Sequence, residues 1–135
     1  MTEERGRSAE GHLGPLEYEV LSVLWTAAPM SVPAVLAQVN ERRIEEPELA
    51  YTTVMTVLTR LHEKGILNRD RRGRGYEYEP RFTEAELVVH LSRQEVDDLL
   101  ERYGAVALAQ FADAVQDADP DLHRQLRDLA GSSDA

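Results

Sequence analysis

The chain has 135 residues, of which 42% are hydrophobic and 30% are charged, a composition typical of a small globular protein. It contains no cysteine, which excludes disulfides and cysteine nucleophiles and is compatible with a reducing cytoplasm. No apolar run approaches the roughly 20 residues that a membrane-spanning helix needs, and residues 1–11 lack the apolar region of a signal peptide. We therefore expect a cytoplasmic protein without membrane insertion.

The net charge of −10 is unevenly distributed along the chain. Residues 83–135 carry four arginines against twelve aspartates and glutamates, whereas residues 60–76 carry six cations against two carboxylates. Because local charge decides where a phosphate backbone can dock, the basic stretch keeps nucleic acid open as a partner despite the acidic total. Composition alone equally allows a solvated surface turn.

Hydrophobic periodicity predicts three helices in the first half of the chain. They cover residues 15–27, 32–43 and 50–64. Pro15 suits the first helical turn, Ser31 is a good N-cap for the second helix, and Gly65 lies where the C-cap of the third belongs. The polar, aperiodic residues 1–12 are expected to form a disordered tail.

After Gly65 the hydrophobic period changes to two, which indicates β-strands. Residues 66–72 and 76–81 read as two strands joined by a flexible turn at residues 73–75. Three helices followed by such a hairpin predict a mostly α fold with a small β-hairpin wing. This is a winged helix-turn-helix domain, expected over residues 13–82.

The remaining residues return to a helical pattern, which begins at a capping box formed by Thr83 and Glu86. Gly104 is expected to break or kink this helix. The apolar stripe along residues 83–130 is too narrow for a core of its own, so we expect a helical dimerisation region that pairs with a second copy. The candidate dimerisation residues are Leu87, Leu91, Leu99, Leu100 and Phe111. Residues 131–135 are expected to form a tail.

The third helix has the composition of a recognition helix. Short hydroxyl side chains can approach phosphates and base edges in the major groove, and the first turn of such a helix is the part that faces DNA. The alternative is a plain surface helix whose first turn only caps it. The candidate DNA-binding residues on its exposed face are Tyr51, Thr52, Thr53, Thr56 and Arg60.

The hairpin tip supplies the candidate wing residues Arg71, Arg72 and Arg74. Arginine suits this role because its planar fork binds phosphate through two hydrogen bonds and fits a narrow minor groove. The stretch lacks a nucleotide-binding glycine pattern.

No set of residues in the sequence indicates catalysis or cofactor binding. The four histidines stand outside metal-ligand spacing of one another, and no pair of carboxylates or activated hydroxyl is distinguished. We therefore expect neither an enzyme nor a metal protein.

Several segments together resemble one known family. Residues 49–61 (LAYTTVMTVLTRL) closely resemble the recognition helix of the BlaI/MecI/CopY family of bacterial repressors, also called the penicillinase repressor family. Residues 13–25 resemble the first helix of the family, and residues 64–67 and 76–78 resemble its wing. The similarity covers about residues 13–116.

The resemblance implies a homodimer that represses transcription by occupying a palindromic operator. Its N-terminal winged helices would bind DNA, and its C-terminal helices would dimerise. The family positions that contact DNA correspond to Tyr51, Thr52, Thr53, Thr56 and Arg60, with Arg72 and Arg74 in the wing.

Two features depart from the pattern of the family. The copper-responsive members carry C-terminal cysteines, which are absent here. The β-lactam-responsive members are cleaved at an Asn-Phe bond, and the matching residues here are Gln110 and Phe111, which keep only the phenylalanine. Proteolytic release would need a protease partner, such as a membrane sensor protease encoded nearby.

Two alternative functions remain open on the sequence. The acidic C-terminal helices could bind a protein partner, which would make the chain a winged-helix protein-interaction module. The dimer crevice could hold a small molecule, which would make it a ligand-responsive repressor.

Overall fold

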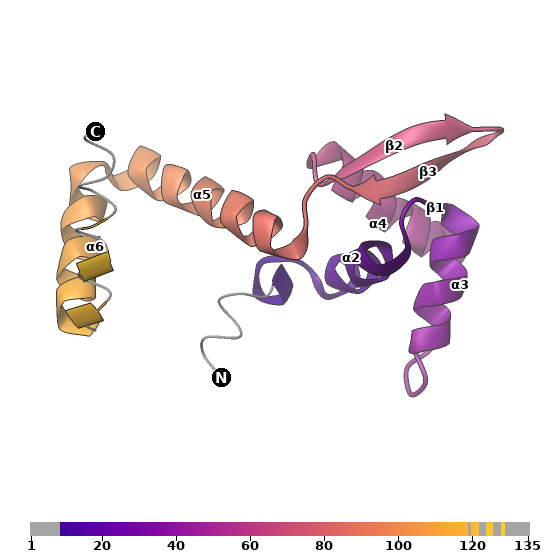
Figure 1. The fold of residues 1–135 in the computed structure, drawn as a ribbon, viewed down its shortest axis with the longest axis horizontal. Helices are drawn as coiled ribbons and strands as arrows, with labels where there is room; N and C mark the ends of the chain where they lie inside the picture. The colour runs from indigo at the N-terminus through magenta and orange to yellow at the C-terminus, as the bar shows by residue number, and fades with distance from the viewer. Residues whose placement is uncertain (1–8, 119, 122–123, 126–127, 129–135) are drawn as a thin grey trace. The chain divides into compact units, whose positions relative to one another are not determined.

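The structure, a computed structural model, describes residues 9–118, 120–121, 124–125 and 128. The chain divides into two units, Met1–Leu91 and Ser92–Ala135. Figure 1 shows the elements in chain order: η1 (Ala9–His12), α2 (Pro15–Ala27), β1 (Met30–Ser31), α3 (Val32–Arg42), α4 (Tyr51–Glu63), β2 (Leu67–Arg72), β3 (Gly75–Pro80), α5 (Glu84–Tyr103) and α6 (Ala105–Ala118). The three helices predicted for the first half of the chain are confirmed as α2, α3 and α4.

One hydrophobic core holds the first unit together. Each of the helices α2, α3 and α4 turns one apolar stripe inward, where Leu21, Val35 and Leu58 are fully buried. Leu67 of β2 and Tyr78 of β3 close the same core from the sheet. The mostly α fold with a β-hairpin is therefore confirmed.

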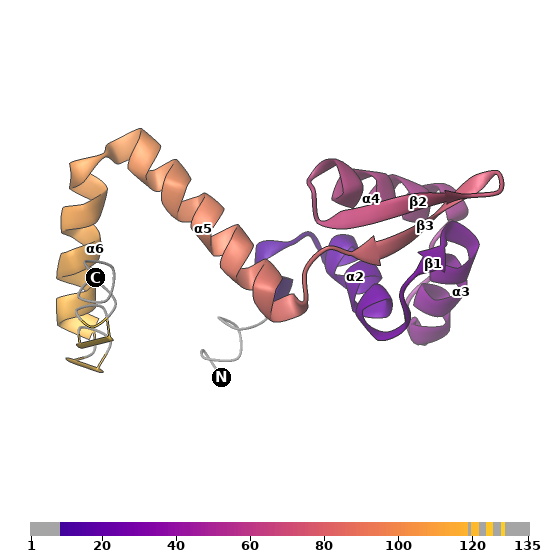
Figure 2. The ribbon, with the colours of Figure 1, turned by 45° about the horizontal axis from the view of Figure 1, so that its top comes forward.

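The strands form a three-stranded antiparallel sheet in the order β1-β3-β2 (Figure 2). Met30 pairs with Tyr78 in the first ladder, and Arg69 pairs with Tyr78 in the second. The sequence did not predict β1, because a strand of two residues is too short to show a period of two.

The hairpin loop is tighter than expected. Arg72 pairs directly with Gly75, so only Gly73 and Arg74 connect the strands, whereas a turn over residues 73–75 was predicted. Gly73 has a φ of +62°, a left-handed conformation that glycine adopts without steric cost and that short hairpin loops require. Gly104 has a φ of +58° and separates α5 from α6, as expected of a helix break.

The N-terminal segment is ordered further than predicted. The expected disordered tail ran to residue 12, but residues 9–12 form the 3-10 helix η1, and Ala9 is fully buried. The Ala9 N–H donates to Glu84 Oε2 at 3.0 Å. A single 3-10 turn is too short for hydrophobic periodicity to indicate it. The predicted tail at residues 131–135 lies outside the described residues.

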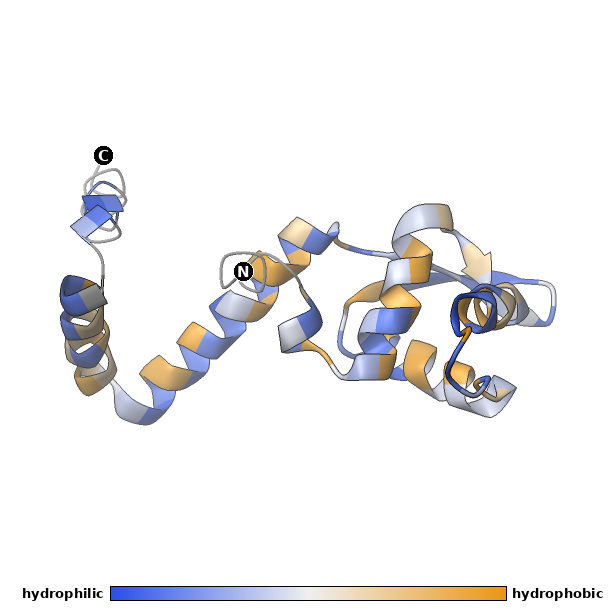
Figure 3. Ribbon diagram, turned by 90° about the horizontal axis from the view of Figure 1, so that it is seen from below, coloured by the Kyte–Doolittle hydropathy of each residue, from blue (hydrophilic) through white to orange (hydrophobic). Residues whose placement is uncertain are grey.

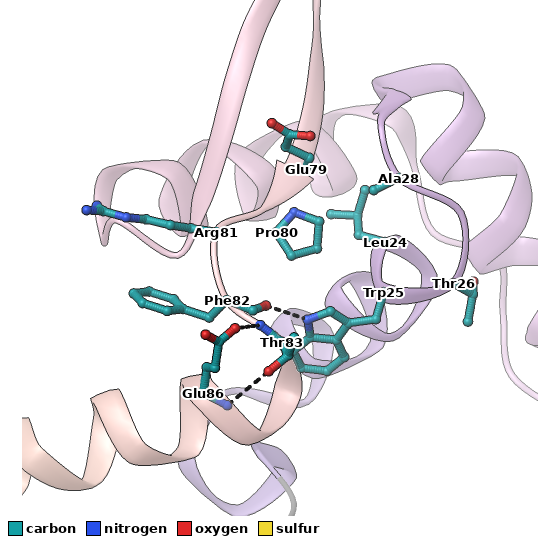
Figure 4. Close-up of a pocket in the computed structure, with 10 residues that line it drawn as sticks. All are labelled: Leu24, Trp25, Thr26, Ala28, Glu79, Pro80, Arg81, Phe82, Thr83 and Glu86. Atoms are coloured by element: carbon teal, nitrogen blue, oxygen red, sulfur yellow. Dashed lines mark hydrogen bonds between the residues drawn. The ribbon is translucent and has the colours of Figure 1, made fainter.

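The start of α5 is fastened to the winged-helix core (Figure 4). The Trp25 Nε1–H donates to the Phe82 carbonyl oxygen at 3.0 Å. The predicted capping box is confirmed, because Thr83 N–H donates to Glu86 Oε1 at 2.9 Å and Glu86 N–H donates to Thr83 Oγ1 at 3.1 Å. A hollow of about 380 Å³ lies beside these contacts, between the end of α2 and the end of β3. Leu87, one turn further along, is fully buried in the core.

Hydrophobic residues recur along both α5 and α6 (Figure 3). Within the part of the chain that the structure describes, no helix combines the length and the apolar character that crossing a membrane requires.

Asn40 positions the segment that leads into α4. Its side-chain amide donates to the Leu49 carbonyl oxygen at 3.1 Å, and its Oδ1 accepts from the Leu49 N–H at 2.7 Å. This pair of hydrogen bonds satisfies the backbone of a half-buried residue in the α3–α4 connection.

We expect Asn40→Ala to lower the free energy of unfolding by about 1–3 kcal/mol, because both Leu49 backbone groups would lose their partner. Urea denaturation measures this change. Gln38→Ala, at an exposed position of the same helix, is the control and is expected to change stability by less than about 0.5 kcal/mol. Equal effects of the two substitutions would contradict a positioning role for Asn40.

Candidate nucleic-acid interface

Helix α4 has one buried face and one exposed face. The buried face consists of Val54, Val57, Leu58 and Leu61. On the opposite face Thr52, Thr56 and Arg60 are exposed, and Thr53 is half-buried. Tyr51 is 47% exposed at the first turn. Four of the five predicted residues of α4 therefore lie on one accessible surface.

The threonine hydroxyls of α4 bond back to the helix. Thr56 Oγ1–H donates to the Thr52 carbonyl oxygen at 2.8 Å, and Thr59 Oγ1–H donates to the Met55 carbonyl oxygen at 2.8 Å. Each hydroxyl thus donates its single proton to a carbonyl oxygen of the same helix, and its lone pairs can still accept hydrogen bonds.

The N-terminus of α4 has no side-chain cap. Its N-cap residue is Ala50, which accepts no hydrogen bond through its side chain. The Thr53 N–H donates to the Ala50 carbonyl oxygen at 3.1 Å. The N–H groups that precede it and the positive end of the helix dipole are therefore the ones that can meet an anion such as phosphate.

The two faces of the hairpin carry different charge. Side chains alternate along a strand, so Arg69 and Arg71 share the face of Tyr76 and the buried Tyr78. The Arg69 guanidinium carbon lies 4.1 Å from the centroid of the Tyr76 ring, and that of Arg71 lies 5.8 Å from it. Both distances are within the range of cation–π attraction.

The opposite face of the hairpin is mainly acidic. Asp70 lies directly opposite Glu77 in the register of the two strands, and Glu79 lies on the same face. Arg72 Nε lies 3.2 Å from Glu77 Oε1 and forms an ion pair with it. One of the predicted wing arginines is therefore already bound to a carboxylate of its own hairpin.

A hollow of about 390 Å³ connects the hairpin tip to the start of α4. Its lining residues are Ser31, Val32, Pro33, Tyr51, Arg72, Arg74, Gly75, Tyr76 and Glu77. Tyr51 thus lines the same hollow as Arg72 and Arg74, although 21 or more positions separate it from them in the sequence. The fold joins the predicted helix face and the predicted wing into one surface.

The positive charge of this surface is concentrated on four arginines. Lys64 is paired with Glu17 at 2.8 Å, and Arg72 is paired with Glu77. Among the described residues, no carboxylate lies within ion-pair distance of four others, which are Arg60, Arg69, Arg71 and Arg74. These cations are the ones that a phosphate backbone can meet without displacing a protein carboxylate.

Sequence reasoning missed two residues of this surface. Met55 is 45% exposed in the middle of the α4 face, and Arg69 stacks on Tyr76 within the hairpin. The helical period already put Met55 outside the buried set of α4. The strand period of two already put Arg69 on the face of Arg71. The sequence pattern could therefore have identified both residues as part of this surface.

The structure separates the predicted dimerisation residues into two groups. Leu87 is fully buried, and Leu91 is half-buried against the same core of the first unit. In the second unit Leu99 and Phe111 are 44% and 57% exposed, and Leu100 is half-buried. Further exposed apolar side chains of that unit are Val96, Tyr103, Val106 and Leu108.

The predicted cleavage residues Gln110 and Phe111 are exposed and lie inside α6. Among the residues that the structure describes, no three histidines, aspartates or glutamates are grouped in a way that could hold a metal ion.

The helices, the three-stranded sheet and the basic hairpin define a winged-helix protein. A solved structure described as the complex structure of hsRosR-S4 has the same overall fold, with a TM-score of 0.52 over 95% of both chains at 18% sequence identity. At that identity the likeness concerns the fold alone.

Sequence comparison assigns the family. Residues 13–131 match the penicillinase repressor family. A Mycobacterium tuberculosis protein named transcriptional regulator BlaI is 36% identical over 122 residues, which cover 87% of this chain and 84% of the relative. A Bacillus licheniformis protein named penicillinase repressor is 29% identical over 72 residues, or 53% of each chain.

The chain belongs to the penicillinase repressor family, a family of transcriptional repressors and not of enzymes. The family predicted from residues 49–61 and from the wing is thereby confirmed.

Proposed function

We propose that this protein represses transcription by binding a palindromic operator in double-stranded DNA as a homodimer in the cytoplasm. The observation that carries the proposal is the single surface on which α4 and the hairpin tip meet at the hollow lined by Tyr51, Arg72 and Arg74. A helix fits the major groove, and an arginine-bearing hairpin beside it reaches the adjacent backbone or minor groove.

Helix α4 would supply the sequence-specific contacts. Its uncapped N-terminus favours a phosphate at the edge of the groove. From this position Tyr51, Thr52, Thr53 and Thr56 would face base edges or phosphates over the first turns of the helix. Arg60, about one turn beyond Thr56, would contact the DNA backbone or a guanine.

The wing would supply contacts that do not depend on sequence. Arg71 and Arg74 have no ion-pair partner among the described residues, so they can neutralise phosphates directly. Arg72 must first leave Glu77, which makes its contribution smaller.

The second unit would provide the dimer contacts. Val96, Leu99 and Tyr103 recur at intervals of three and four residues on α5 and are all exposed within one chain. Phe111 adds a large exposed ring on α6. A second copy that covers these side chains would also supply the second DNA half-site that a palindromic operator requires.

Release from the operator would follow cleavage in the dimerisation region. The candidate bond between Gln110 and Phe111 lies inside α6, so local opening of the helix would have to precede cleavage. A membrane sensor protease encoded nearby would be the partner for this step.

The test of DNA binding is fluorescence anisotropy with the DNA upstream of the gene for this protein, measured over a series of salt concentrations. Each phosphate that a cation neutralises is expected to add about 0.9 to the slope of log affinity against log salt. Complexes must form at low salt, seen as a rise in anisotropy, and must weaken steeply as salt rises. Absence of binding at every salt concentration would refute the proposal.

We expect Arg74→Ala to weaken binding to all DNA sequences alike and to lower the salt slope by about 0.9. The physical reason is the loss of one phosphate contact at the wing tip. Arg93→Ala is the matched control, because Arg93 lies on α5 and is paired with Asp97. An unchanged salt slope in the Arg74 variant would remove the wing from the DNA interface.

We expect Glu77→Gln to raise the affinity for DNA by about two- to fivefold, a gain equivalent to the free energy of one exposed ion pair. The substitution frees Arg72 for a phosphate, and the same anisotropy assay measures the gain. Glu79→Gln removes a charge from the same hairpin face without touching the Arg72 pair and is the control.

A double-mutant cycle identifies the cause of that gain. If Glu77 acts through Arg72, the gain disappears when Arg72 is already alanine. A gain that persists in the Arg72→Ala background, or that Glu79→Gln reproduces in full, would show general charge repulsion instead.

We expect Leu99→Glu to raise the dissociation constant of the dimer on the order of a hundredfold or more. A symmetric interface loses two buried leucines and gains two charges. Sedimentation equilibrium measures the effect. Gln94→Glu introduces the same side chain elsewhere on α5 and is expected to leave the dimer intact. Equal dissociation in both variants, or in neither, would contradict the assigned interface.

A further inference from the structure

The exposed face of α4 consists of two rows of residues spaced four positions apart. Tyr51, Met55 and Thr59 form one row, and Thr52, Thr56 and Arg60 form the other. Met55 lies in the middle of the first row, is 45% exposed, and is absent from the hydrophobic core. An unbranched thioether side chain at the centre of this surface is a flexible, apolar contact element.

Two threonines beside Met55 have no free hydroxyl proton. The Thr56 and Thr59 hydroxyl protons are bound to the Thr52 and Met55 carbonyl oxygens, both at 2.8 Å. What these threonines present outward is therefore a methyl group and an acceptor oxygen. Arg60 supplies a strong donor only at the C-terminal end of the surface.

This chemistry matches one base better than the others. Guanine presents two acceptors in the major groove, which need a donor such as arginine or lysine. Thymine presents a 5-methyl group, and adenine opposite it presents an N6 amino donor. Met55 and the threonine methyl groups can contact the thymine methyl group. The threonine oxygens can accept a hydrogen bond from the N6 amino group of adenine.

We propose that Met55, together with the methyl group of Thr56, reads the 5-methyl groups of thymine in the bound DNA. The inference rests on the proposed function and deepens it, because it names the base that the centre of α4 selects. Arginines of the wing and Arg60 would then provide affinity, and the apolar centre would provide preference for A·T pairs.

The experiment compares two duplexes that differ only in that methyl group. A duplex is first selected from a random-sequence pool on the full-length protein. It is then synthesised with thymine and, separately, with deoxyuridine at each thymine position in turn. We expect the affinity of the unmodified protein to fall about fourfold at each contacted position, the equivalent of burying one methyl-sized group.

Two variants identify the residues responsible. Met55→Ala is expected to bind the thymine and deoxyuridine duplexes almost equally at the position that Met55 contacts. Thr56→Ser removes only a methyl group and can keep the hydroxyl bond to Thr52, so it is expected to abolish the preference at a neighbouring position. Ile44→Ala, at a 90% exposed residue outside α4, is the control and should keep both preferences.

The outcomes separate this inference from the proposed function. Selection that recovers no duplex would refute both. Tight binding with equal affinity for thymine and deoxyuridine would overturn only the methyl reading. A preference for thymine that survives unchanged in both the Met55 and the Thr56 variants would assign it to DNA shape and would also overturn the inference.

Discussion

The burial of one stripe of α4 is the constraint on which the rest of the interface depends. Val54, Leu58 and Leu61 are fully buried between the other helices and the sheet. Rotating the helix would expose these side chains at a cost of about 1.5–3 kcal/mol each. The opposite face, with Met55 and Thr56, is therefore held outward in one orientation. The proposed DNA-binding surface is therefore the face of α4 that lies opposite the core.

The same reasoning extends to the wing. Leu67 and Tyr78 anchor one face of the hairpin in the core, and strand alternation then fixes the faces of all other side chains. Arg69 and Arg71 continue the anchored face toward the tip. The opposite face is acidic, and there Glu77 already holds Arg72. An overall charge of −10 is thus compatible with a basic surface, because the charge is unevenly distributed and twelve of the 25 carboxylates lie in residues 83–135.

Much of the fold and of the site could be predicted from local pattern. The periods of 3.6 and 2 located α2, α3, α4 and the hairpin, and the capping box at Thr83 and Glu86 formed as expected. The prediction was wrong for residues 9–12, because η1 and the contact of Ala9 with Glu84 join segments 75 positions apart. Leu87 likewise belongs to the winged-helix core, although its spacing alone places it in the same stripe as the exposed Leu99.

The sequence by itself determined which residues could be buried, which could bind phosphate, and to which family the chain belongs. Those properties follow from side-chain chemistry and short-range spacing. Only the tertiary structure decided that Tyr51 and Arg74 line one hollow, that Arg72 is paired and Arg74 is not, and that Met55 stands in the middle of the exposed face. These facts depend on contacts between distant segments, and hydrophobic periodicity carries no information about which distant segments meet.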